Sequence, residues 1–169
     1  MKSDFIDFFG EKLKEIDKVK VKTLQKAITE NDNIIILGNG GSNSVASHIS
    51  QDYTKCLKKK SFTFSDPSRL TCYINDYGME NAYKIFLQEF AGDNTLVILI
   101  SSSGNSLNIY NCASYCQKNN IPFILLTGFS SDNKVRQSFS DTAVVDFWVD
   151  ADDFGIVECL HQVILHSII

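Results

Sequence analysis

The sequence predicts an α/β protein in which a parallel β-sheet is covered by helices on both faces. Its 169 residues suit one domain, and 44% of them are hydrophobic, which is enough for a globular core. Four short apolar runs alternate with longer amphipathic stretches. Continuous apolar runs are typical of strands buried on both faces, and parallel strands need crossover connections. The runs therefore predict the strands, and the stretches between them predict the crossover helices.

The order of the elements follows from this alternation. The first helix is predicted over residues 3–30, because apolar side chains recur there at three- and four-residue spacing. Strands are predicted at residues 33–37, 95–100, 123–127 and 143–149, with a weaker candidate at 70–74. Helices are predicted at residues 42–57, 81–90 and 106–119, and from 153 to the C-terminus. The lysines at positions 55 and 58–60 are interpreted as a solvated helix end, where cations complement the helix dipole.

Charge and cysteine content limit the function classes. Sixteen basic and 20 acidic residues give a net charge of −4, so the basic surface typical of a nucleic-acid-binding protein is absent. No apolar run is long enough to span a bilayer, and the N-terminus lacks the apolar core of a secretion signal. The five cysteines are odd in number and scattered, which predicts a reducing compartment, the cytoplasm. Cys112 and Cys116, at i,i+4 without a second ligand pair, are interpreted as core residues.

Two loops of small residues follow predicted strands at the sheet edge where ligands bind in α/β proteins. The glycine loop is residues 38–42 (Gly-Asn-Gly-Gly-Ser), and the serine loop is residues 101–106 (Ser-Ser-Ser-Gly-Asn-Ser). Backbone N–H groups, hydroxyls and the following helix N-termini all suit an anion, most often a phosphate. The candidate ligand-binding residues are Asn39, Gly40, Gly41, Ser42, Ser101, Ser102, Ser103 and Ser106. The alternative is that the small residues only cap a helix at Ser106.

Neither loop carries a standard nucleotide signature. The glycine loop has no Lys after its glycines, as a P-loop requires, and Asn43 stands where a dinucleotide fingerprint has its third Gly. The predicted ligand is therefore a phosphorylated compound other than a nucleoside triphosphate or NAD.

All three histidines lie on two predicted helices. His48 and Asp52 share one helix face at i,i+4, while Glu158 and His166 lie two turns apart on the last helix, with His161 between them at another angle. Two imidazoles and two carboxylates suit a Zn²⁺ site or an acid/base pair. The alternatives are an ordinary exposed pair for His48 and Asp52, a surface or ligand-orienting position for His161, and a satisfied buried His166.

These segments together resemble the sugar isomerase (SIS) domain family. The resemblance is carried by the glycine loop and His48, by residues 75–78 (Asn-Asp-Tyr-Gly), by the serine loop, and by Glu158, His161 and His166. It covers nearly the whole chain in the right order, and within the family the chain is similar to the sedoheptulose 7-phosphate isomerases, also called phosphoheptose isomerases, as a divergent member.

The resemblance implies a single SIS domain over residues 1–169, a three-layer sandwich with a five-stranded parallel sheet. It also implies a homotetramer, with the helix at residues 3–30 at a subunit interface. The implied activity is cytoplasmic conversion of sedoheptulose 7-phosphate to D-glycero-D-manno-heptose 7-phosphate, for activated heptoses of surface polysaccharide such as lipopolysaccharide or capsule.

The resemblance also implies roles for individual residues. The four serines of the serine loop would hold the phosphate, and Ser42 and Asp76 would contact the sugar. The implied zinc ligands, one ion per site, are His48, Asp52, Glu158 and His166. The implied catalytic groups are Asp52 and His166, with Glu158 able to replace one of them as acid or base.

Two of the four implied ligands depart from the family pattern. Asp52 stands where the family has Glu, which shortens the carboxylate arm by one methylene, and Glu158 stands where the family has Gln, which adds a negative charge. These departures leave two alternatives open. One is an isomerase for another phosphosugar. The other is a non-catalytic SIS protein that binds a replication initiator or senses phosphosugars.

Overall fold

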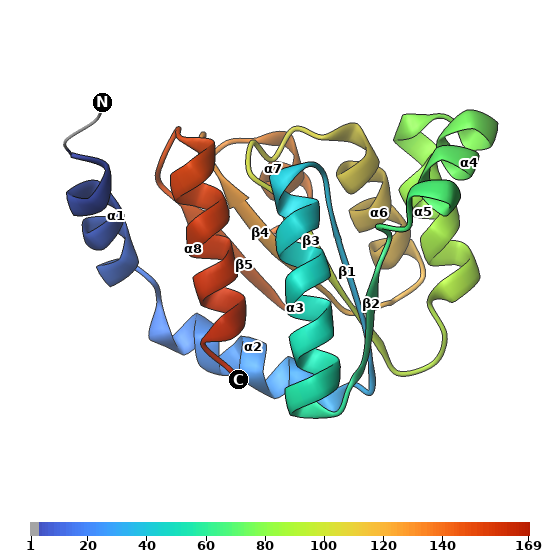
Figure 1. The fold of residues 1–169 in the computed structure, drawn as a ribbon, viewed down its shortest axis with the longest axis horizontal. Coiled ribbons are helices and arrows are strands. Elements are labelled where there is room, and N and C mark those ends of the chain that lie inside the picture. The colour runs from blue at the N-terminus through green and yellow to red at the C-terminus, as the bar shows by residue number, and fades with distance from the viewer. Residues whose placement is uncertain (1–3) are drawn as a thin grey trace.

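The computed structural model describes residues 4–169 as a five-stranded parallel sheet between two layers of helices (Figure 1). The strand order is β2-β1-β3-β4-β5. The strands are β1 (Asn33–Gly38), β2 (Lys60–Thr63), β3 (Thr95–Ser101), β4 (Phe123–Gly128) and β5 (Val145–Val149). The helices are α1 (Phe5–Lys14), α2 (Lys18–Glu30), α3 (Gly41–Leu57), α4 (Pro67–Tyr77), α5 (Met79–Phe90), α6 (Leu107–Lys118), α7 (Lys134–Phe139) and α8 (Phe154–His166). The predicted α/β fold is confirmed.

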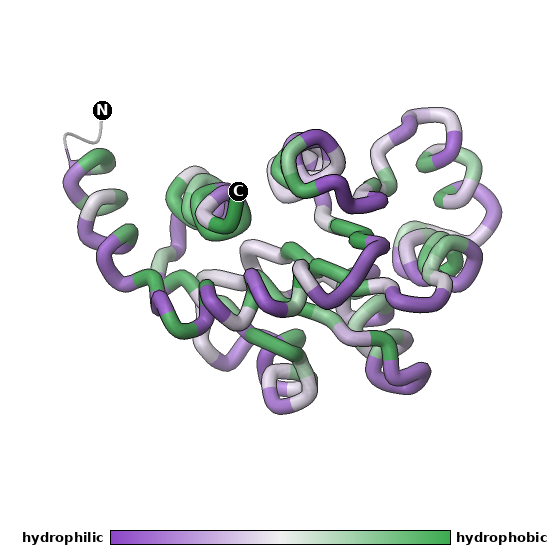
Figure 2. The backbone as a smooth tube through the Cα atoms, turned by 90° about the horizontal axis from the view of Figure 1, so that it is seen from below, coloured by the Kyte–Doolittle hydropathy of each residue, from purple (hydrophilic) through white to green (hydrophobic). Residues whose placement is uncertain are grey.

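Alternate residues of the central strands point to opposite helix layers, because side chains of a strand alternate between faces. Ile34 and Ile36 of β1 pack with residues of α2, α3 and α8. Ile35 and Leu37 pack with residues of α5, α6 and α7. Figure 2 shows helices on both sides of the sheet, with hydrophobic segments concentrated in the layer between them. This burial on both faces explains why the strands read as continuous apolar runs.

The predicted strand at residues 70–74 is wrong, because this segment belongs to helix α4. Asp66 caps α4 by accepting from the backbone N–H of Arg69 (2.8 Å), and Pro67 occupies the first turn. The fifth strand is β2, which pairs with β1 at the sheet edge. Lys60, interpreted as part of a helix end, is the first residue of this strand. Strand β2 lacks the apolar pattern of the other strands because it has only one neighbouring strand and is partly exposed.

The N-terminal segment forms two helices where the sequence predicted one over residues 3–30, of which residue 3 lies outside the described residues. Asp17 separates α1 from α2 because its backbone is extended and its carboxylate accepts from the N–H groups of Val19 (2.7 Å) and Lys20 (3.2 Å). A local side-chain cap therefore starts a second helix where the apolar periodicity alone predicts one continuous helix.

Two further expectations bear on the core. Cys112 and Cys116 are fully buried on the inner face of α6, as predicted for core residues. All five cysteines are free.

Within residues 4–169, no helix combines the length and the apolar character that crossing a lipid bilayer requires.

Candidate active site

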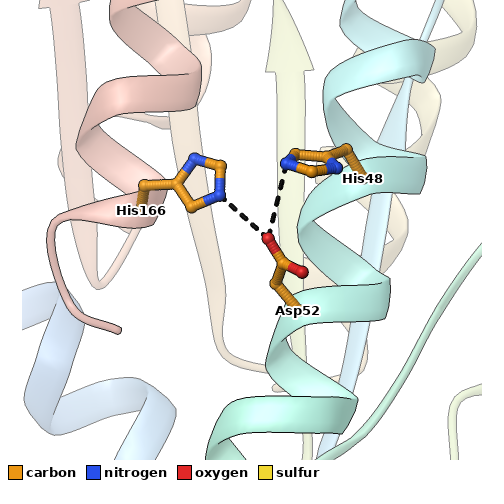
Figure 3. A group of neighbouring side chains, drawn as sticks. All are labelled: His48, Asp52 and His166. Carbon is orange, nitrogen blue, oxygen red and sulfur yellow. Dashed lines mark hydrogen bonds and ion pairs between the residues drawn. The ribbon is translucent and has the colours of Figure 1, made fainter.

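Three predicted site residues meet between helices α3 and α8. His48 and Asp52 project from α3, and His166 projects toward them from the last turn of α8 (Figure 3). The Nε2 atom of His166 lies 2.9 Å from Asp52 Oδ2, and the Nε2 atom of His48 lies 3.4 Å from the same oxygen. The two imidazole rings are 5.0 Å apart between centroids. His48 and Asp52 are therefore more than an isolated surface pair, and the His166 side chain, 35% exposed, is not a buried core group.

The donor set of this cluster fits a metal such as Zn²⁺. One ligand atom from each of the three residues lies within 4.8 Å of the other two. In a tetrahedral zinc site with bonds of about 2.0–2.1 Å, neighbouring ligand atoms are about 3.3 Å apart. The separations of 2.9 and 3.4 Å to Asp52 Oδ2 are close to that value. Three protein ligands would leave a fourth position open, as catalytic zinc sites do.

The environment of Asp52 keeps its carboxylate ionised. The hydrogen bond with His166 lowers the pKa of Asp52 below its ordinary value. Partial burial opposes this shift, and positive charge on His48 or His166 adds to it. The 2.9 Å contact also shows that the shorter side chain of Asp52 reaches His166, because α3 and α8 approach closely at this point.

The serine loop and the glycine loop line one pocket at the carboxyl edge of the sheet. Among the described residues, this pocket is lined by Asn39, Ser42, Ile100, Ser101, Ser102, Ser103, Ser106, Phe154 and Glu158. The hydroxyls of Ser42 and Ser102 lie 3.3 Å apart, which joins the two loops. Ser106 precedes α6, but its hydroxyl accepts from Ser101 (3.3 Å) and does not cap the helix. This arrangement favours the ligand-binding interpretation of the serine loop over the capping alternative.

Glu158 lies in this pocket and outside the His48–Asp52–His166 cluster. Its carboxylate rests against Gly41, where a Cβ atom would come within 2.1 Å of Glu158 Oε2. The pKa of Glu158 is raised above its ordinary value by burial, and a hydrogen bond from the backbone N–H of Ser42 opposes part of this rise. The carboxylate therefore occupies the N-terminus of α3, a position that favours negative charge. The structure brings together three of the four expected metal ligands and places Glu158 beside the predicted phosphate site.

Replacing Glu158 by Gln is expected to tighten the binding of inorganic phosphate at least about fivefold, because Glu158 lines the same pocket and like charges a few ångströms apart repel by about 1 kcal/mol or more. Isothermal titration calorimetry measures this change. D152N is the matched control, since Asp152 is an exposed acid outside the pocket. Weaker phosphate binding by E158Q would contradict the expectation.

A brace from the loop after β4 supports the serine loop. Asn133 is 3% exposed, and its side-chain amide donates to the carbonyl of Ser130 (2.8 Å) and accepts from the N–H of Arg136 (3.1 Å). It packs on Gly104, whose φ of +63° is in the left-handed region. The N–H of Val135 also donates to the carbonyl of Gly104 (3.0 Å). The serine loop thus has a fixed shape before any ligand binds.

Replacing Gly104 by Ala is expected to lower the free energy of unfolding by about 2–5 kcal/mol. One cause is that a residue with a Cβ atom is strained in the left-handed conformation, and the other is that the added methyl group overpacks the contact with Asn133. The new Cβ would lie 2.0 Å from Asn133 Cγ and Oδ1. Urea denaturation measures the loss. G92A is the control, because nothing lies within 4 Å of a Cβ at Gly92. Equal stability of G104A and G92A would show that the brace is not rigid.

The structure places other site candidates differently. Asp76, expected to contact the sugar, is exposed on α4 and hydrogen-bonds with Asn75 and Cys72, and it does not line the serine pocket. His161 is fully buried and its Nε2 lies 3.0 Å from the carbonyl oxygen of Thr127, which makes it a core residue. Phe154, which the sequence analysis missed, lines the pocket although it is 57% exposed. Its place just after β5, at the ligand-binding edge of the sheet, was the available signal.

No family model matches the chain. It is 30% identical over 164 residues to the phosphoheptose isomerase of Fusobacterium nucleatum, with 94% of this chain and 81% of the relative covered. It is also 30% identical over 162 residues to the phosphoheptose isomerase of Helicobacter pylori strain Shi470, with coverages of 92% and 82%.

Solved structures share the fold. The phosphoheptose isomerase from Neisseria gonorrhoeae superposes with a TM-score of 0.83 at 22% identity, covering 95% of this chain and 88% of that chain. The sugar isomerase domain of an RpiR transcription factor from Sphaerobacter thermophilus gives a TM-score of 0.66 at 16% identity, with coverages of 96% and 84%. With relatives at 30% identity over most of its length, the chain belongs to the phosphoheptose isomerase family.

Proposed function

We propose that this protein is an aldose–ketose isomerase that converts sedoheptulose 7-phosphate to D-glycero-D-manno-heptose 7-phosphate, for activated heptoses of surface polysaccharide. Family membership supports the reaction class, since the relatives are named phosphoheptose isomerases. The observation that carries the proposal is the placement of a hydroxyl-lined pocket and an imidazole–carboxylate cluster along the same helix, α3.

The spacing between the two sites suits a long sugar phosphate. Ser42 of the pocket and His48 of the cluster are six residues apart on α3, which corresponds to about 9 Å along the helix axis. An extended seven-carbon sugar phosphate spans about 10 Å from C1 to phosphorus, at about 1.25 Å per bond. The axial spacing of the two sites on α3 therefore matches the length of such a sugar phosphate.

The serines of the pocket would bind the phosphate through hydroxyl and backbone donors. Ser101 and Ser102 are already buried in the pocket, so these donors are oriented before the ligand arrives. The pocket is lined by no lysine or arginine among the described residues, so neutral donors and the N-terminus of α6 would supply the attraction. Ser42 lines the pocket and remains a proposed sugar contact, whereas Asp76 lies on α4 outside the pocket and keeps that role only as a proposal from the family resemblance.

The cluster would move a proton between C1 and C2 through an enediol. Aldose–ketose isomerisation needs a base for a carbon-bound proton and an acid for the oxygens. Asp52 and His166, in hydrogen-bond contact, would divide these roles. Glu158 lies in the serine pocket and outside this cluster, so it would not replace either of them. His48, Asp52 and His166 would hold a Zn²⁺ ion, which when bound polarises carbonyl and hydroxyl oxygens as a Lewis acid.

Purified protein incubated with sedoheptulose 7-phosphate in D₂O tests the proposal. The expected result, followed by ¹H NMR, is appearance of the aldose with deuterium incorporation, loss of turnover after metal removal, and recovery with Zn²⁺. Binding of the phosphosugar without turnover under either metal condition would reject the isomerase and favour a non-catalytic SIS protein. Faster turnover of a shorter ketose phosphate would identify another phosphosugar isomerase.

We also propose that the protein assembles as a homotetramer in the cytoplasm. Helix α1 has no buried residue, and its apolar side chains Phe5, Ile6 and Leu13 are 36%, 81% and 40% exposed, so a second subunit would cover them. Five free cysteines agree with a reducing compartment. Light scattering measures the mass in solution, and a monomer would contradict the assembly.

A further inference from the structure

A buried tyrosine connects α3 and α8 directly behind the His48–Asp52–His166 cluster. Tyr53 follows Asp52 on α3, and Leu165 precedes His166 on α8. The side chain of Tyr53 is fully buried, and its hydroxyl donates to the carbonyl oxygen of Leu165 at 2.9 Å. The two helices are thus joined twice at adjacent residues, once by this hydrogen bond and once by the contact of Asp52 with His166.

The carbonyl of Leu165 belongs to the last turn of α8, where carbonyl groups lack helical partners. The amide of Ile169, which would reach Leu165 in a longer helix, donates to the carbonyl of His166 instead (3.0 Å). Tyr53 therefore supplies a donor that the end of α8 needs. Burial raises the pKa of Tyr53, so its hydroxyl keeps the proton that it donates.

This second connection matters because the carboxylate arm of Asp52 is short. An aspartate side chain reaches its partner only where the helix backbones are close, and the His166 Nε2–Asp52 Oδ2 distance is 2.9 Å. An aliphatic side chain at position 53 would fill the same core space, but it would fix neither the axial position nor the rotation of α8. The hydroxyl adds a directional contact one residue from each partner in the cluster.

We propose that Tyr53 is a positioning residue that holds the last turn of α8 at the distance and rotation that His166 needs to meet Asp52. The inference rests on the proposed function for its consequence in catalysis, and on the Tyr53–Leu165 hydrogen bond for its structural content. It assigns no contact between Tyr53 and the substrate.

The Y53F variant tests the proposal, with Y83F as the matched control. Tyr83 is also buried, at 2% exposure, and its hydroxyl donates to the carbonyl of Gly38 at 3.1 Å, away from the cluster. Both variants remove one buried hydroxyl, so both are expected to lose stability. Only Y53F is expected to shift the imidazole ¹⁵N resonances of His166 and to weaken Co²⁺ binding about tenfold, as loss of a group that orients ligands does.

A second background separates positioning from a general loss of stability. In D52E the carboxylate arm is one methylene longer and tolerates a wider helix spacing. Adding Y53F to D52E is therefore expected to weaken Co²⁺ binding by less than about threefold, against about tenfold in the native background. Equal losses in the two backgrounds would overturn the proposal.

The ¹⁵N measurement also separates this inference from the proposed function. If the native protein neither binds Co²⁺ nor turns over sedoheptulose 7-phosphate, the proposed function fails, while the His166 resonances still decide the role of Tyr53. Unchanged His166 resonances in Y53F, or equal changes in Y53F and Y83F, would show that Tyr53 is only a core residue.

Discussion

Replacing Asp52 by Asn is expected to lower kcat for sedoheptulose 7-phosphate about 10²- to 10⁴-fold, the range typical of losing a general acid or base. Asn has nearly the same shape as Asp but carries no negative charge for His48 and His166, which both turn Nε2 toward Asp52 Oδ2. The phosphosugar should still bind, because the serine pocket is separate from this oxygen. Steady-state kinetics and calorimetry with the phosphosugar measure the two effects.

The control for this variant is D93N, because Asp93 is exposed in the turn before β3 and belongs neither to the His48–Asp52–His166 cluster nor to the serine pocket. Its kcat should stay within about twofold of the native value, as for surface substitutions away from a site. The lowered pKa of Asp52 adds a pH criterion, since the group stays ionised throughout the neutral range. A limb in the pH–rate profile between pH 5 and 8 must therefore come from another group. Full activity of D52N would remove Asp52 from the proposed mechanism.

Acidification from pH 6.5 to about pH 4 is expected to cost about 3 kcal/mol of folding free energy through His161 alone. Burial lowers the pKa of His161 from 6.5 to about 4, and its Nδ1 has no hydrogen-bond partner among the described residues. Nε2 carries the proton, because it faces the carbonyl oxygen of Thr127, which can only accept.

The sign of the effect follows from proton binding. Above pH 6.5, His161 is neutral in both the folded and the unfolded state and contributes no pH dependence. Between pH 6.5 and 4 the unfolded state binds a proton that the folded state excludes, so stability falls as the pH falls. Below the folded pKa both states are protonated and the loss is complete.

Urea denaturation at several pH values measures this dependence. The H161Q variant should have a shallower slope between pH 6.5 and 4, because Gln does not titrate. The same slope in the native protein and H161Q would contradict the assignment of the acid sensitivity to His161.

Local sequence patterns were sufficient for most of the secondary structure. The predicted strands at residues 33–37, 95–100 and 123–127 agree closely with β1, β3 and β4, because full burial on both faces requires uninterrupted apolar runs. The edge strand β2 and helix α4 were misassigned. An edge strand pairs on one side only, and α4 is defined by its Asp66 cap more than by its apolar content.

The candidate site was predictable as a set of residues but not as a geometry. The resemblance grouped His48, Asp52, Glu158 and His166, while the structure gathers three of them and sets Glu158 against Gly41. Helical spacing places Glu158 and His166 two turns apart, or about 12 Å, so one cluster could not be read from the sequence alone. Asp76 illustrates the same limit, because its position depends on how α4 packs.

The sequence by itself determined the alternation of strands and helices, the two loops at the carboxyl edge, and the family, because these depend on local spacing and residue type. Only the tertiary structure decided that His166 meets a carboxylate 114 positions away, that Ser106 leaves its helix uncapped, and that His161 is buried. Such pairings depend on the rotation and spacing of packed helices, which are fixed by burial across the whole core.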